Sequence, residues 1–124
     1  DIIRLMNAVK PPYNINQLTQ QRARKALIDG EADMQHQVQE ILSERDRVEK
    51  ALGVHPKVQK IYPSDANFLL VKFTGHDQIF QTLRSKGIVV RDRSNAPLCD
   101  QCLRLTIGTV QENDLLLQTL NEIT

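Results

Sequence analysis

The chain has 124 residues, the length of one domain, and its 40% hydrophobic and 25% charged residues are typical of an ordinary globular protein. Sixteen basic against fifteen acidic residues leave a formal net charge of +1. The basic residues are scattered along the sequence and the chain has no Trp, so no nucleic-acid-binding surface is predicted. No apolar run reaches the roughly 18 residues of a membrane span and no signal-peptide pattern is present, so we expect a cytoplasmic protein without a membrane partner.

The N-terminal residues have the pattern of an amphipathic helix rather than of a native start. Residue 1 is Asp instead of Met, from which we expect an excised part of a longer protein. The apolar residues at helical spacing are Ile2, Ile3, Met6 and Val9. The segment Pro11 to Asn14 should end this helix in an extended connector, because proline lacks an amide donor. Apolar surface exposed here favours self-association of the chain.

Two more helices are predicted before residue 53. Asn14 or Asn16 is placed to cap the first, which should stop near Gly30. Its predicted inner face consists of Leu18, Ala23, Ala26 and Leu27. The second runs from about Ala32 to Leu52, with apolar residues on one side and charged residues on the other, and Gly53 is expected to end it in a left-handed conformation. This helix has no predicted chemical role.

Beyond Gly53 the sequence alternates between short strands and helices. Strands are predicted at Lys57–Ile61 and Phe68–Phe73, and the nearly continuous apolar run of the second predicts burial on both of its faces. A helix should open at Thr74 to Asp77 and run through Lys86, with Gly87 just past its end.

Two further apolar runs and a last helix complete the pattern. Ile88 to Val90 and Leu103 to Ile107 indicate strands joined by a loop, and Thr109 with Glu112 forms a capping box for the final helix. Three helices followed by a β-β-α-β-β-α order predict an α+β fold. It should contain about four mostly antiparallel strands covered by helices and preceded by a long helix.

Arg91 and Arg104 interrupt the two apolar runs. Alternation places Leu103, Leu105 and Ile107 on one face of the strand, and Arg104 with Thr106 on the other. If the two strands are antiparallel neighbours, the guanidiniums converge, and their planar forks match a carboxylate or a phosphate. The structural alternative is two solvated arginines, or one arginine paired with Asp92 or Asp100.

Cys99 and Cys102 form a CxxC motif, which can be a redox pair or half of a zinc site. There is no second CxxC, the histidines lack a metal-ligating spacing, and the motif precedes a strand, so we expect two reduced thiols and no metal. Nucleophile-elbow, dinucleotide and phosphate-loop signatures are absent, and no lysine lies in an apolar setting. Asn67 is interpreted as a structural turn amide, and the chain lacks a complete catalytic constellation.

Three stretches, taken together, resemble the C-terminal small domain of the histidinol-phosphate aminotransferase family of fold-type I enzymes. They are Asn67 to Leu70, Gly87 to Asp92, and Cys102 to Thr109 with Glu112 following. Pro11 to Asn16 is similar to the segment where the family's chain leaves the large domain, and the predicted long helix resembles its interdomain helix. The resemblance therefore covers essentially the whole chain.

The resemblance implies that Arg104 binds the anionic group of a phosphorylated or carboxylate substrate, with Arg91 as its partner at the phosphate end. It implies that residues 1–30 are a remnant of the large domain and linker, and residues 31–124 the small domain. The family's enzymes act in histidine biosynthesis as homodimers. With pyridoxal 5'-phosphate, they convert histidinol phosphate and 2-oxoglutarate to imidazole-acetol phosphate and glutamate.

The family's Schiff-base lysine and other cofactor-binding residues belong to the large domain and have no match here. The resemblance thus implies no catalytic or cofactor-binding residue in this chain, which alone should be inactive. A threonine-phosphate decarboxylase or an aromatic aminotransferase would share the same strands and arginine. From other classes, a free-standing anion-binding or regulatory module and a CxxC metal or redox module are the alternatives.

Overall fold

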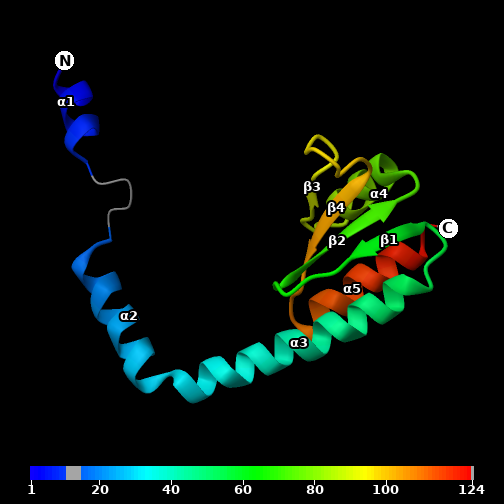
Figure 1. Cartoon of the computed structure of the whole chain (residues 1–124), viewed down its shortest axis with the longest axis horizontal. Coiled ribbons are helices and arrows are strands. Elements are labelled where there is room, and N and C mark those ends of the chain that lie inside the picture. The colour runs from blue at the N-terminus through cyan, green and yellow to red at the C-terminus, as the bar shows by residue number, and fades with distance from the viewer. Residues whose placement is uncertain (11–14, 124) are drawn as a thin grey trace. The chain divides into compact units, whose positions relative to one another are not determined.

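The computed structural model describes residues 1–10 and 15–123 and divides into two compact units, Asp1–His36 and Gln37–Thr124 (Figure 1). The elements in chain order are α1 (Ile2–Val9), α2 (Gln17–Asp29), α3 (Glu31–Gly53), β1 (Val58–Tyr62), β2 (Phe68–Phe73), α4 (His76–Ser85), β3 (Arg91–Asp92), β4 (Cys102–Thr106) and α5 (Val110–Asn121). The predicted α+β class is confirmed. Among the described residues, no helix is both long and apolar enough to cross a membrane.

The first unit consists of capped helices with exposed side chains. The Asp1 carboxylate accepts a hydrogen bond from the Ile3 amide at 3.1 Å and caps the start of α1. The Asn16 side chain accepts one from the Thr19 amide at 2.9 Å and caps the start of α2. The predicted cap of the second helix is therefore Asn16, and the predicted connector at Pro11 to Asn14 lies outside the described residues. The predicted inner face of α2 is wrong, because every residue of α2 is exposed.

The second unit is built on a four-stranded antiparallel sheet in the order β1-β2-β4-β3. Figure 1 shows α5 running alongside the second half of α3 in this unit. The buried apolar side chains of the sheet and of α3, α4 and α5 form one core. Its main members are Val48, Leu52, Leu69, Val71, Phe73, Ile79, Leu83, Leu103, Leu105, Leu116 and Leu120.

The opposite face of the sheet is open. Along β2, Leu69, Val71 and Phe73 are fully buried, whereas their alternating neighbours are only half-buried. The predicted burial of this strand on both faces is therefore wrong, because the core contacts only one face of the sheet. The open face displays the side chains that carry the candidate site.

Two local predictions fail for identifiable reasons. Ile88 to Val90 do not pair in the sheet, since the Ile88 amide donates to the α4 carbonyl of Leu83 at 2.9 Å, and β3 is confined to Arg91–Asp92. Gly53 is the last residue of α3 and is not left-handed, because the His55 amide donates to the Leu52 carbonyl at 3.1 Å and closes the helix end. Gly87, just past α4, does take a left-handed conformation with φ of 78°.

Candidate functional site

The two predicted arginines lie directly opposite each other in the sheet. β3 and β4 are antiparallel neighbours, which is the condition under which the two guanidiniums were expected to converge, and their register pairs Arg91 with Arg104. Directly opposed residues of an antiparallel pair project from the same face. Both guanidiniums therefore leave the sheet on its open face.

Arg104 packs against an aromatic ring and has no ion-pair partner among the described residues. Its guanidinium carbon lies 5.0 Å from the centre of the Phe68 ring, and its Nε is buried with no hydrogen-bond partner among the described residues. A buried donor without a partner costs free energy, while the aromatic face restrains the guanidinium. The exposed Arg91 lies across the ladder from it. The arrangement suits an anion with several oxygens.

The neighbouring carboxylates pair elsewhere. The Asp92 carboxylate accepts the Ser94 amide at 2.8 Å, and this bond, with help from the nearby His76, lowers the pKa of Asp92. The Asp100 carboxylate lies 3.5 Å from the Lys72 ammonium. Within the described part of the chain, the predicted alternative of an arginine paired with either carboxylate is therefore not what the structure shows.

The sheet register extends the arginine pair into a row of four side chains. Tyr62 is opposite Leu70, Leu70 is opposite Arg104, and Arg104 is opposite Arg91. Tyr62 and Leu70 are half-buried, and burial together with the Cys102 thiol raises the pKa of Tyr62. The row offers an apolar and aromatic end beside a cationic end. Sequence reasoning missed Tyr62 and Leu70, although counting the alternation across the predicted β1–β2 hairpin would have found them.

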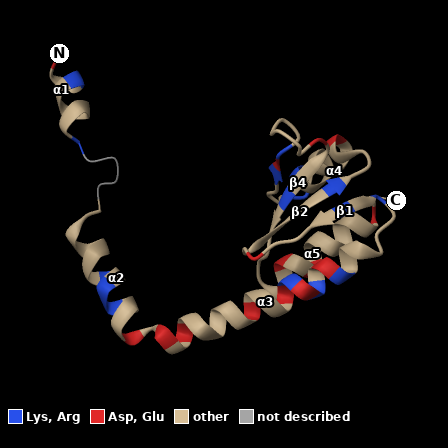
Figure 2. Cartoon of the chain, viewed as in Figure 1, with Lys and Arg blue, Asp and Glu red and all other residues tan. Residues whose placement is uncertain are grey.

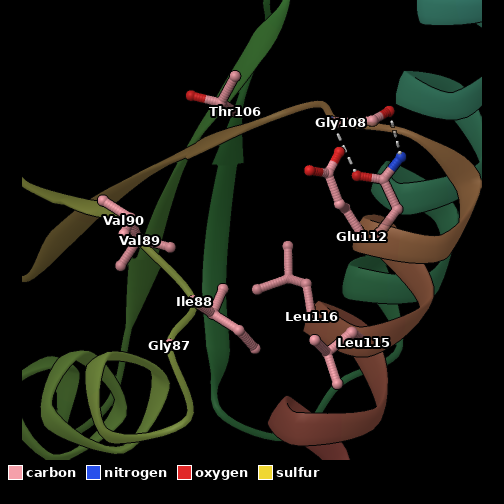
Figure 3. A pocket seen from close by; sticks show the side chains of 10 residues that line it. Gly87, Ile88, Val89, Val90, Thr106, Gly108, Glu112, Leu115 and Leu116 are labelled. Atoms are coloured by element: carbon pink, nitrogen blue, oxygen red, sulfur yellow. Dashed lines mark hydrogen bonds between the residues drawn. The ribbon is translucent and has the colours of Figure 1, made fainter.

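A second feature that the sequence did not reveal is a clamp on the turn between β4 and α5. The buried Asn113 side chain accepts a hydrogen bond from the Gly108 amide and donates one to the Gly108 carbonyl, both at 3.0 Å. Dashed lines at Gly108 in Figure 3 mark these bonds. The same amide group donates to Glu44 of α3 at 2.8 Å. This contact ties the turn that follows the Arg104 strand to the long helix.

The clamp continues into an ion-pair network between α3 and α5, where Figure 2 shows acidic and basic residues side by side. The Glu44 carboxylate accepts two bonds from Arg47, at 2.7 and 2.9 Å, and Arg47 also lies 2.8 Å from Asp114. These bonds, with that from Asn113, lower the pKa of Glu44, whose side chain is only 14% exposed. The charged face of α3 therefore has a structural role.

A pocket of about 360 Å³ lies beside the clamp but does not contain the arginines (Figure 3). Ile88, Val89 and Val90 form one side and Leu115 with Leu116 the other. The acidic residue of the pocket, Glu112, takes part in the capping box of α5, where its carboxylate accepts a hydrogen bond from the Thr109 amide at 2.8 Å. The pocket is thus a mainly apolar groove, and the two arginines of the candidate site lie elsewhere, on the open face of the sheet.

The lysines of this chain do not lie in the surroundings expected of a lysine that forms a Schiff base with a cofactor. Every lysine is at least partly exposed, so none lies in the buried apolar surroundings that favour Schiff-base chemistry. The Lys60 ammonium lies 4.6 Å from the centre of the Tyr62 ring in the row of four side chains, and Lys72 is paired with Asp100.

Comparison with known proteins gives the family. Residues 1–120 match the family model of class I and II aminotransferases, so the chain belongs to that family. Within it, the chain is similar to histidinol-phosphate aminotransferases. It is 53% identical over 123 residues to the one from Parabacteroides distasonis, covering 99% of this chain and 35% of that relative. The resemblance seen in the sequence is confirmed.

Solved structures share the fold. The histidinol-phosphate aminotransferase from Clostridium acetobutylicum matches with a TM-score of 0.81 at 24% identity, over 98% of this chain and 37% of that one. A decarboxylase from Sulfurospirillum multivorans matches with a TM-score of 0.72 at 25% identity, over 98% of this chain and 36% of that one. The chain therefore spans little more than a third of these proteins. Because the fold accommodates differently named enzymes, the substrate must be argued from the site.

Replacing Asn113 with alanine should destabilise the fold by about 2 kcal/mol, since it removes three hydrogen bonds, among them those to the backbone N–H and C=O of Gly108. Urea unfolding measures the change. Asn121→Ala is the matched control, because Asn121 is exposed on the same helix, and its effect should stay within about 0.5 kcal/mol. Equal losses in the two variants would contradict the clamp.

The lowered pKa of Glu44 predicts a pH dependence of stability. The pKa of Glu44 in the folded chain lies below its ordinary value, so the unfolded chain binds the proton more readily as acid is added. Glu44 contributes to the free energy of unfolding at pH values above its unfolded pKa, and this contribution is lost as the pH falls through its folded pKa. Glu44→Gln should therefore flatten the acid side of the stability curve, measured by unfolding at a series of pH values. Glu49→Gln, exposed on the same helix, should leave the slope unchanged.

Proposed function

We propose that this chain supplies the substrate-anion site of a pyridoxal-phosphate-dependent aminotransferase that acts on histidinol phosphate and 2-oxoglutarate. One observation carries the proposal: Arg104 lies opposite Arg91 on an open sheet face, restrained by Phe68, and its buried Nε has no hydrogen-bond partner in the described part of the chain. The similarity to histidinol-phosphate aminotransferases supports this choice of substrates.

The two substrates share the feature that this site recognises. Histidinol phosphate ends in a phosphate, and 2-oxoglutarate and glutamate carry carboxylates. A guanidinium fork binds either group through two parallel hydrogen bonds, so one arginine pair can serve both halves of a transamination. Fixing the anionic group orients the rest of the substrate, which is how binding at a distance from the reacting bond accelerates a reaction. Arg104 and Arg91 are positioning and binding groups in this proposal.

The chemistry itself belongs to the bound cofactor, which acts as an electron sink for the substrate amine. We place the cofactor and its lysine outside residues 1–124, because no lysine here has suitable surroundings. In this proposal residues 1–30 connect to the large domain, residues 31–124 form the small domain, and the whole enzyme is a cytoplasmic homodimer.

Titrating the chain with inorganic phosphate tests the anion site, with amide NMR shifts as the readout. Arg104→Gln should weaken phosphate binding about tenfold or more, since a charge-assisted hydrogen bond contributes roughly 1.5–3 kcal/mol. Arg104→Lys should give an intermediate loss, because it keeps the charge but not the fork. Arg84→Gln, an exposed arginine on α4, is the control. If Arg104→Gln and Arg84→Gln titrate alike, the arginine pair is not the site.

The reaction is tested separately in the full-length enzyme that contains this chain. We expect transfer of the amine of histidinol phosphate to 2-oxoglutarate and no decarboxylation of a phosphorylated amino acid. Arg104→Gln should raise KM for both substrates, because one arginine serves both anions. Decarboxylation without transamination would replace this reaction with that of a related decarboxylase, while leaving the anion site intact.

A further inference from the structure

The cysteine pair closes a tight turn at the start of β4. The Cys102 amide donates to the Cys99 carbonyl at 2.9 Å, with Asp100 and Gln101 as the two central residues. Such a four-residue turn holds its first and last Cα atoms less than about 7 Å apart. A disulfide joins Cα atoms that are about 4.4–6.8 Å apart, so the turn brings the two cysteines to a suitable separation.

The two thiols differ in access to solvent. Cys99 is half-buried, whereas Cys102 is fully buried with its sulfur 3.5 Å from the Asp100 carbonyl. Burial, followed by the influence of Cys99, raises the pKa of Cys102. An external reagent therefore meets Cys99 first, and Cys102 is placed to react second, from within the turn.

The surroundings do not suit the other uses of a CxxC motif. Among residues 1–10 and 15–123, neither cysteine belongs to a group of three or more side chains that could ligate a metal; the group found there is His76, Asp77 and Asp92. The motif also stands at the start of a strand and not at the start of a helix, where a thioredoxin-like thiol would be activated. The remaining use of the motif is a reaction between the two thiols, which lie in one turn.

We propose that Cys99 and Cys102 are a site of reversible oxidation, forming a disulfide across the turn by exchange with a small disulfide such as oxidised glutathione. The inference is independent of the proposed function. Cys99 gives its proton to solvent, and its thiolate attacks one glutathione sulfur. A Cys99–glutathione bond forms as the glutathione disulfide breaks, and the released thiolate takes up a proton.

The second step closes the ring. Cys102 loses its proton and attacks the Cys99 sulfur, so that the Cys99–Cys102 bond forms and the second glutathione leaves as a thiol. The protein is oxidised by two electrons and one glutathione disulfide is reduced to two thiols. The bond would tie the loop between β3 and β4, the strands that carry Arg91 and Arg104, without involving either guanidinium.

The experiment treats the chain with oxidised glutathione, alkylates the remaining thiols and measures the intact mass. Wild type should lose two hydrogens, carry no glutathione and resist alkylation, and dithiothreitol should reverse the change. Cys102→Ser should retain one glutathione on Cys99, because the second thiol is missing. Cys99→Ser should react with glutathione roughly tenfold more slowly than Cys102→Ser, since its remaining thiol is buried.

Because Cys102 is fully buried, Cys102→Ala provides a second variant that places no hydroxyl in the buried site, and circular dichroism checks that each variant is folded. Cys102→Ala should behave as Cys102→Ser does. The proposal is overturned if folded wild type keeps a glutathione adduct, if both of its thiols are still alkylated after treatment, or if the product is a disulfide between two chains on a non-reducing gel.

Discussion

The register between β2 and β4 determines which side chains this domain buries and which it displays. Leu69 pairs with Leu105 and Val71 with Leu103, and all four side chains are fully buried. The same register commits Arg104 to the open face. A slip of one residue would place the guanidinium in the core and the leucines in solvent, so the burial of the apolar residues also orients Arg104, the centre of the proposed anion site.

The end of β4 needs a second constraint, because strand pairing alone does not place the turn that follows it. Asn113 supplies that constraint by hydrogen bonding to the backbone N–H and C=O of Gly108 while donating to Glu44. In this way α3, the turn and α5 form one hydrogen-bonded unit behind the sheet. The site therefore rests on side chains that the ligand would not touch.

Much of this organisation follows from local sequence pattern. Alternation within Leu103 to Ile107 correctly separated the core side chains from Arg104, and the Thr109 and Glu112 capping box was confirmed. The clamp could not be predicted, since Glu44 and Asn113 are 69 residues apart and each resembles an ordinary helix-surface residue. The failure at Ile88 to Val90 has a related cause: an apolar run does not reveal whether its backbone has a partner strand.

The position of the arginines at a sheet edge has a thermodynamic consequence. Like charges directly opposite each other weaken strand pairing, and β3, which holds one of them, is only two residues long. An anion bound by both guanidiniums would turn this repulsion into a bridge between the strands. Ligand binding and the stability of the sheet edge are then linked, so the ligand would stabilise the fold as well as occupy the site.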